Sequence, residues 1–275
     1  MDTLIELRNA SKRFGKKVVF EDVQFKIMQA QTLALTGQNG SGKSTLLRII
    51  AGLSNLSSGQ RLLSGERKKL RIGYVPEHFP KLHFTPNEYL TYMGSIQGLS
   101  KAHIQDKISE LFDMFSISSM QNTYIKYLSK GSIQKIAVIQ ALLSEPELLL
   151  LDEPLSGQDS DSQASFIDLL HKYKKQGLGI VLACHEKFLV DKLADRVAII
   201  RNKKIDVLSS RLKPVMTITF RTNENFVHEK PDFEGILSCS YEGQSCTIIC
   251  DKEKCDNIIY NLLNMKCSIE SVNEC

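Results

Sequence analysis

The sequence lacks the features that would place it within a membrane or mark it for secretion. None of its apolar runs approaches the roughly 18 residues that a spanning helix needs. The sequence does not begin with a basic stretch followed by an apolar segment, which is the pattern of a signal peptide. Internal repeats and low-complexity tracts are absent as well. Any membrane role would therefore come through a partner protein.

The sequence also has little charge imbalance, since 35 basic and 31 acidic residues leave a net charge of +4. This balance does not indicate nucleic acid as a partner, and we expect none. With 275 residues, of which 42% are hydrophobic, the chain is long enough for one large domain with an appendage or for two domains.

Cysteine pairs of the C-x-x-C type, which would indicate a zinc site, are absent too. Six of the seven cysteines lie between Cys239 and Cys275. Cys246, Ile248 and Cys250 alternate as on one face of a strand. Because free cysteine packs as a small hydrophobe, we expect these thiols to be core residues of a protein in the reducing cytosol.

Two strand patterns are present. Residues 5–7 and 23–27 alternate apolar with polar side chains, which predicts antiparallel sheet. Four apolar runs do not alternate and suit strands buried on both faces of a parallel sheet, with buried helix segments as the alternative. They are TLALT (32–36), LLLLD (148–152), IVLAC (180–184) and VAII (197–200). The patterns predict an α/β fold with a mostly parallel sheet and an N-terminal antiparallel β subdomain.

Between about residues 77 and 145 the pattern becomes helical, so a helical subdomain is expected to interrupt a domain spanning residues 1–210. In TPNE (85–88), Thr85 can cap a helix and Glu88 can reach back to it. Ser100 can cap a second helix, and a third is expected to begin near Ser132.

The composition shifts after about residue 210. Strands are expected at 215–220, 236–241 and 246–250, followed by a helix at 252–265. Residues 211–275 are therefore predicted to form a small C-terminal α+β domain.

The stretch GQNGSGKST (37–45) joins a predicted buried strand to a predicted helix and fits G-x-x-x-x-G-K-[ST]. Glycines let backbone N–H groups approach phosphate oxygens, and the helix N-terminus favours negative charge. Lys43 can reach the β- and γ-phosphates, Ser44 can ligate Mg²⁺ and Thr45 can contact the α-phosphate. The alternative is a glycine-rich turn with a surface lysine. The pattern predicts a nucleoside triphosphate site formed by Gly37, Gln38, Asn39, Gly40, Ser41, Gly42, Lys43, Ser44 and Thr45.

Two adjacent carboxylates end the run LLLLDEP (148–154). Successive residues at a strand end point in different directions. Asp152 can therefore hold Mg²⁺ while Glu153 orients and deprotonates a water near the γ-phosphate. Pro154 forces a turn away from the strand, which suits a site at the carboxyl ends of a parallel sheet. The alternative is that DEP is only a turn after a strand.

The stretch LSKGSIQK (128–135) places two serines and a glycine directly ahead of an apolar helix. It contains no nucleophile–base pair and no metal-ligand cluster. From the residues alone, Ser129 or Ser132 is an ordinary helix N-cap.

Taken in this order, the motifs make residues 3–205 resemble the ATP-binding subunits of ABC transporters. The resemblance implies a P-loop ATPase in which two ATP molecules are sandwiched between a head-to-tail pair of subunits. LSKGSIQK stands where this family has L-S-G-G-Q. The resemblance therefore implies that Ser129 and the backbone N–H of Gly131 contact the γ-phosphate held by the partner subunit.

Further residues match the family one at a time. Phe14 matches the aromatic that stacks on adenine, although a buried phenylalanine near a turn is the alternative. Asp159 matches a loop that crosses the dimer interface. His185 matches the switch histidine that contacts the γ-phosphate, although a lone histidine is more often structural.

The chain departs from the family at two places. Glu77 stands where the family usually has a glutamine whose carbonyl meets Mg²⁺ and the attacking water, so it adds negative charge near Asp152. Glu77 could still ligate Mg²⁺. Lys130 and Ser132 replace the third and fifth signature residues, and the LSKG form resembles separately encoded ATPases of bacterial exporters.

The resemblance implies an ATPase subunit, dimeric with itself or with a related ATPase. It would power an integral membrane permease from the cytoplasmic face of the membrane, in the direction of export. The alternative is a soluble ABC ATPase acting on DNA or the ribosome. Long heptad insertions, which relatives acting on DNA carry, and a second ATPase unit, usual in relatives acting on the ribosome, are both absent here.

Overall fold

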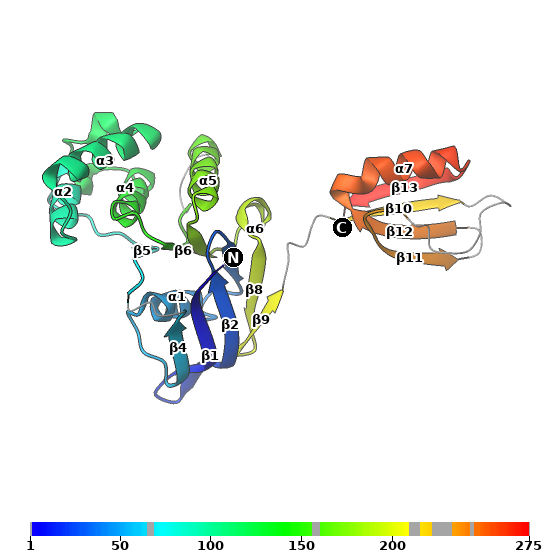
Figure 1. Cartoon of the computed structure of the whole chain (residues 1–275), viewed down its shortest axis with the longest axis horizontal. Helices are drawn as coiled ribbons and strands as arrows, with labels where there is room; N and C mark the ends of the chain where they lie inside the picture. Colours follow the sequence, from blue (N-terminus) through cyan, green and yellow to red (C-terminus); the bar gives the residue numbers. More distant parts are fainter. Residues whose placement is uncertain are drawn as a thin grey trace. The chain divides into compact units, whose positions relative to one another are not determined.

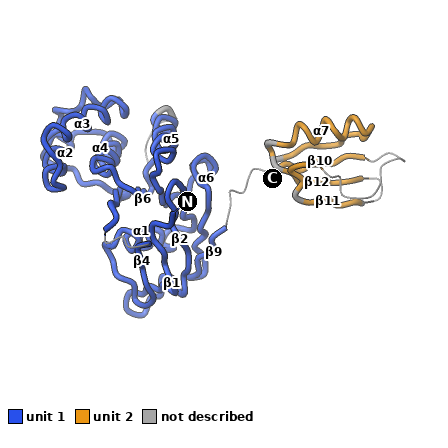
Figure 2. The backbone as a smooth tube through the Cα atoms, in the orientation of Figure 1, with its two compact units in different colours: residues 1–211 blue, residues 212–275 orange. Residues whose placement is uncertain are grey.

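The computed structural model describes residues 2–64, 69–155, 160–208, 215–221, 233–242 and 245–274. The chain separates into two compact units, residues 1–211 and 212–275 (Figure 2). The first unit holds two hydrophobic clusters and the second holds one of its own. We therefore describe each unit by itself.

The central sheet of the first unit has the strand order β5-β6-β7-β3-β8-β9. Its strands pair in parallel except at β9, which is antiparallel to β8. They are β3 (Thr32–Thr36), β5 (Ile72–Val75), β6 (Leu148–Asp152), β7 (Gly179–Ala183), β8 (Arg196–Arg201) and β9 (Lys204–Leu208). The predicted mostly parallel sheet is confirmed.

Strand β6 shows why these runs do not alternate in the sequence. Leu148 and Leu150 belong to one hydrophobic cluster, whereas Leu149 and Leu151 belong to the other. Both faces of the strand are therefore buried, so every position selects an apolar side chain until Asp152.

An antiparallel sheet of order β2-β1-β4 contains β1 (Thr3–Phe14), β2 (Lys17–Met28) and β4 (Ser58–Leu63), which confirms the predicted N-terminal subdomain. Helix α1 (Lys43–Ala51) buries Leu46, Leu47 and Ile50 in the cluster that this sheet shares with β3. This packing fixes the start of α1 close to the end of β3.

The helical subdomain contains α2 (Pro86–Ile96), α3 (Lys101–Met114), α4 (Lys130–Leu142) and the short 3-10 turns η1 (Ser118–Met120) and η2 (Ile125–Tyr127). Figure 1 shows α2, α3 and α4 gathered at one end of the first unit. Thr85 caps α2 in a reciprocal capping box with Glu88, and Ser100 caps α3, as predicted.

Helix α4 begins at Lys130, two residues earlier than the predicted start near Ser132. The reason is local, because the Ser129 side chain accepts a hydrogen bond from the Ser132 backbone N–H at 3.1 Å and so caps the helix. Two further helices, α5 (Ser160–Lys175) and α6 (Lys187–Leu193), were not predicted.

The second unit is an antiparallel sheet of order β11-β12-β10-β13 with helix α7 (Cys255–Asn264) across one face (Figure 1). Its strands are β10 (Val215–Arg221), β11 (Ile236–Glu242), β12 (Ser245–Asp251) and β13 (Ser268–Glu274), and the 3-10 turn η3 (Lys252–Lys254) leads into α7. The α+β class predicted for this segment is confirmed, although β13 was not predicted. The helix buries Cys255, Ile258 and Leu262 in the core of this unit.

None of the helices in the described part of the chain is both long and apolar enough to span a lipid bilayer.

Candidate nucleotide-binding site

The glycine-rich loop between β3 and α1 tolerates no side chain at two of its glycines. Gly37 has φ +149° and Gly42 has φ +110°, both in the region that favours glycine. A Cβ on Gly37 would lie 2.6 Å from the Ile200 carbonyl oxygen, and a Cβ on Gly42 would lie 2.5 Å from Cγ1 of Val19. The loop backbone is therefore held tightly against its surroundings.

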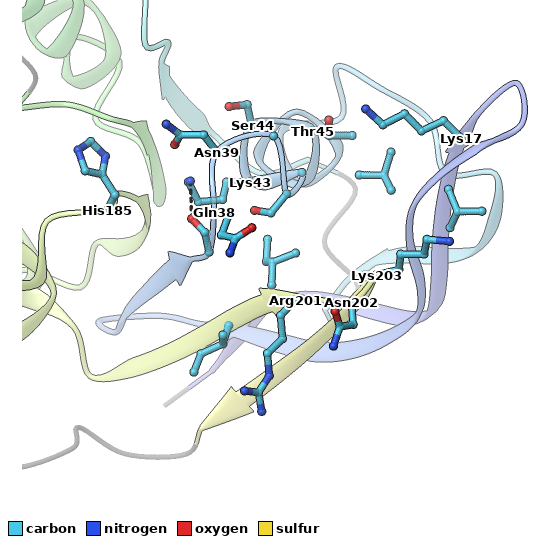
Figure 3. Close-up of a pocket in the computed structure, with 18 of the residues that line it drawn as sticks. Lys17, Gln38, Asn39, Lys43, Ser44, Thr45, His185, Arg201, Asn202 and Lys203 are labelled. Carbon is cyan, nitrogen blue, oxygen red and sulfur yellow. Dashed lines mark hydrogen bonds between the residues drawn. The ribbon is translucent and has the colours of Figure 1, made fainter.

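Lys43 begins α1, and its side chain is only 7% exposed. Its ammonium group donates a hydrogen bond to the Gly37 carbonyl at 3.0 Å, drawn as a dashed line in Figure 3, and lies 3.9 Å from Oε1 of Glu153. The Ser41 hydroxyl is buried with no hydrogen-bond partner among the described residues. A buried cation and an unpartnered hydroxyl in one loop suit phosphate oxygens as ligands.

The loop lines an open cleft of about 1030 Å³, a volume that accommodates a nucleotide. Phe14 lies at the cleft with 56% of its surface exposed, and the Lys12 ammonium is 4.7 Å from its ring centroid. An exposed ring can stack on a base. Its exposure contradicts the alternative of a buried phenylalanine.

The cleft contains basic and polar residues that the sequence analysis did not single out: Lys17, Arg201, Asn202 and Lys203 (Figure 3). Arg201 ends β8, and Asn202 and Lys203 form the turn to β9 with φ +50° and +63°. The Lys203 carbonyl accepts a hydrogen bond from the Glu21 N–H at 2.8 Å, which ties this turn to β2. In the sequence, residues 201–204 show only a largely basic run of side chains. That run does not indicate that they line a cleft.

Asp152 ends β6 and is 3% exposed. Its Oδ1 accepts a hydrogen bond from the Ser44 hydroxyl at 3.1 Å. Burial raises the pKa of Asp152; the Ser44 hydrogen bond opposes this, and the negative charge of Glu77 adds to it. A hydroxyl and a carboxylate are hard oxygen donors of the kind that Mg²⁺ takes, so these two residues fit the predicted magnesium site.

Glu153 follows with φ +50°, a left-handed conformation that is uncommon for any residue but glycine. Its N–H donates to the Ala183 carbonyl at 2.9 Å, and its side chain contacts His185 whereas that of Asp152 contacts Ser44. Burial raises the pKa of Glu153, although its hydrogen bond to His185 opposes the shift.

His185 directly follows the buried Cys184, and 61% of its side chain is exposed. Its Nδ1 lies 2.9 Å from Oε2 of Glu153, and its Nε2 lies 3.9 Å from Oε1 of Glu186. The hydrogen bond to Glu153 raises the pKa of His185. Each ring nitrogen faces a different carboxylate, which suits a protonated imidazole better than a metal ion held by all three side chains.

Of the remaining predicted residues, Glu77 lines the cleft and the signature residues do not. Glu77 lines the cleft with its side chain 48% exposed, 3.6 Å from Nε2 of His78. Ser129 is exposed, and Gly131 lies in the first turn of α4; neither lines the cleft. Asp159 lies outside the described residues. The structure therefore brings the phosphate loop, the acid pair, Phe14, Glu77 and His185 together and leaves the signature stretch outside.

The fold and the phosphate loop define a P-loop nucleoside triphosphatase. A family model described as ABC transporter matches residues 20–156. The ABC transporter ATP-binding protein YxlF of Bacillus subtilis is 30% identical over 85% of this chain and 83% of its own length. The zinc import ATP-binding protein ZnuC of Rickettsia conorii is 32% identical over 70% of this chain and 81% of its own length.

A third relative, the Nod factor export ATP-binding protein I of Cupriavidus metallidurans, is 30% identical over 73% of this chain and 69% of its own length. A solved ATP-binding subunit of an ABC transporter superposes with a TM-score of 0.69 at 28% identity, over 75% of this chain and 90% of that one. The chain belongs to the ATP-binding subunits of ABC transporters, a family of ATPases.

Replacing Glu77 with Gln tests the charge near Asp152. Removing the Glu77 carboxylate removes an influence that raises the pKa of Asp152, so that pKa should fall and Asp152 should stay ionised to lower pH. We expect Glu77→Gln to keep or raise Mg²⁺-dependent ATP turnover and to move its acidic limb to lower pH. The measurement is the ATPase rate against pH at saturating Mg²⁺.

Glu147→Gln is a matched control, because that carboxylate accepts a hydrogen bond from the Arg71 N–H away from the cleft. A loss of more than about tenfold in Glu77→Gln alone, roughly 1.4 kcal/mol of transition-state stabilisation, would show that the carboxylate has a dedicated role.

Proposed function

We propose that two copies of this chain, or this chain and a related ATPase, close head to tail on two ATP molecules and thereby drive an integral membrane permease. The observation that supports this is the separation of the signature stretch from the cleft. Ser129 is exposed at the N-terminus of α4, where the helix dipole favours an anion, yet it does not line the cleft of its own chain. A phosphate bound by a second subunit would lie favourably at that end of the helix.

The cleft residues take the following roles in this proposal. Lys43 and the loop N–H groups hold the β- and γ-phosphates. Glu153 orients the attacking water and accepts its proton, and its raised pKa suits a general base. His185 holds the Glu153 carboxylate at 2.9 Å and would also contact the γ-phosphate. Bound Mg²⁺ would neutralise charge that develops on the phosphate oxygens.

The helical subdomain carries an exposed aromatic surface that suits a protein partner. The rings of Phe84 and Tyr92 lie 5.7 Å apart, and those of Tyr124 and Tyr127 lie 6.3 Å apart. The two pairs are joined because the Ile125 N–H donates to the Phe84 carbonyl at 2.9 Å. Clustered exposed aromatics mark interaction sites, so we propose this surface as the permease contact.

We propose that residues 1–210 act as the ATPase domain, with the helical subdomain inserted at about 77–145, and that residues 211–275 form an accessory domain. The permease would hold the chain at the cytoplasmic face of the membrane. The LSKG form of the signature supports export as the direction. Since the relatives include an import protein and an export protein, transport by inside-out membrane vesicles is the measurement that decides the direction.

Co-purification tests the transport role. The chain is tagged in its native cell, the membranes are solubilised in mild detergent, and the proteins recovered with it are identified. We expect a polytopic membrane protein in comparable amount. Tyr127→Ser, which alters a residue 70% exposed and outside the cleft, should reduce that recovery while ATP binding is kept. Recovery with ribosomes or DNA instead would support the soluble ABC ATPase.

Glu153→Gln should block hydrolysis while ATP still binds and holds the closed dimer. Loss of a positioned general base costs about 100-fold or more in rate. Steady-state turnover and ATP-dependent dimerisation measured by light scattering check both parts. Glu110→Gln, which alters a carboxylate paired with Lys107 on α3, is the control. Retained turnover in Glu153→Gln would refute the proposed role.

Ser129→Arg should lower ATPase activity, on the order of 100-fold, because Ser129 would contact the γ-phosphate of the ATP that the second subunit holds. ATP binding by the monomer should change little. Ser100→Arg is a matched control, since Ser100 caps α3 as Ser129 caps α4 and both changes remove a cap. ATPase rates and monomer ATP affinity are compared. Equal losses in the two variants would mean that Ser129 acts only as a helix cap.

A further inference from the structure

The second unit holds two thiols that nearly touch. Cys239 lies on β11 and Cys246 on the neighbouring β12, and their sulfur atoms are 3.3 Å apart. In this structure both are free thiols.

The strand register places both side chains on the same face of the sheet. Cys239 pairs with Ile248 and Tyr241 pairs with Cys246, so the two cysteines are diagonal neighbours. A disulfide has an S–S length of about 2.05 Å. The sulfurs would therefore approach by about 1.3 Å when the bond forms.

A metal ion fits the pair less well than a bond between the sulfurs. A structural zinc site takes four ligands. Among the described residues of this unit, no group of three or more His, Cys, Asp or Glu side chains brings its ligand atoms within 4.8 Å of one another. Within the described part of the unit, the pair therefore lacks the additional ligands that zinc requires.

The two thiols differ in exposure. Cys239 is partly exposed, whereas Cys246 is fully buried. Burial raises the pKa of Cys246 to about 12, and its contact with the Cys239 thiol adds to the shift. An external oxidant therefore reaches Cys239 first, and Cys246 is placed to resolve the product.

We propose that Cys239 and Cys246 form a reversible disulfide, with a small-molecule disulfide such as oxidised glutathione as the electron acceptor. The Cys239 thiolate attacks one glutathione sulfur, which forms a mixed disulfide and releases the first glutathione thiolate. The Cys246 sulfur, losing its proton, then attacks the Cys239 sulfur and displaces the second glutathione. Two thiols are oxidised, one glutathione disulfide is reduced, and the two protons are taken up by the released thiolates.

The bond would join an edge strand to the interior of its sheet. Strand β11 is the first strand in the order β11-β12-β10-β13, so β12 is the only described strand that pairs with it. A disulfide to β12 would restrict fraying of that edge. The unit would thus gain a covalent link under oxidising conditions and lose it under reducing ones.

Peptide mapping of the full chain tests the proposal. Protein purified with reductant is transferred to mixtures of reduced and oxidised glutathione, its free thiols are alkylated, and it is digested with a protease that cuts after glutamate. Glu242 separates the two cysteines, whereas trypsin has no site between them. We expect a disulfide-linked pair of peptides whose yield rises with the oxidised fraction and falls when dithiothreitol is added.

The second of these peptides also carries Cys250, so fragmentation spectra assign the linked sulfur. Cys239→Ser and Cys246→Ser should each abolish the linkage, and Cys250→Ser should retain it. The peptide map of the chain without substitutions still tests the disulfide if a variant fails to fold. Alkylation of both Cys239 and Cys246 in excess oxidised glutathione, or linkage of either to Cys250, Cys255 or Cys267, would overturn the proposal.

Discussion

The hydrogen bond from Ser44 to Asp152 is the contact on which the site depends. It joins the helix that follows the phosphate loop to the end of β6 across 108 residues of chain, at 3.1 Å. It can form because β7 lies between β3 and β6 in the sheet and all three strands run in parallel, so their carboxyl ends meet at one edge. Burial of β6 on both faces holds Asp152 there, and the left-handed turn at Glu153 then directs the second carboxylate to His185.

Much of this arrangement could be predicted because the chemistry is local in the sequence. A phosphate loop needs glycines, a lysine and a hydroxyl within nine residues, so GQNGSGKST is sufficient. Thr85 and Ser100 were recognisable as caps for the same reason. Arg201 at the end of β8 and the following turn, Asn202 and Lys203, could not be recognised as cleft residues from the sequence. They reach the cleft through the pairing of β8 with β3. Strand β13 has a weak alternation of its own and is held by its pairing with β10.

At the start of α4, the local sequence and geometry do not by themselves assign a role to Ser129. The Ser129 hydroxyl accepts a hydrogen bond from the Ser132 N–H and shares another with the Ser132 hydroxyl. These are the contacts of an ordinary N-cap, so the local geometry has a complete structural explanation. A hydroxyl that accepts from a backbone N–H still has a proton to donate. Capping and phosphate contact are therefore compatible. The Ser129 hydroxyl would make the second contact once another subunit brings a phosphate to this end of the helix.

The interactions of Lys43 give a reason for the cleft to remain ordered before nucleotide arrives. Its ammonium donates to the Gly37 carbonyl and lies 3.9 Å from Glu153, which also accepts from His185. A buried lysine without such partners would be strongly disfavoured. Phosphate oxygens offer stronger, charge-assisted acceptors than a neutral carbonyl. Entry of a triphosphate would thus release Lys43 from Gly37 and weaken its hold on Glu153, leaving that carboxylate to His185 and the attacking water.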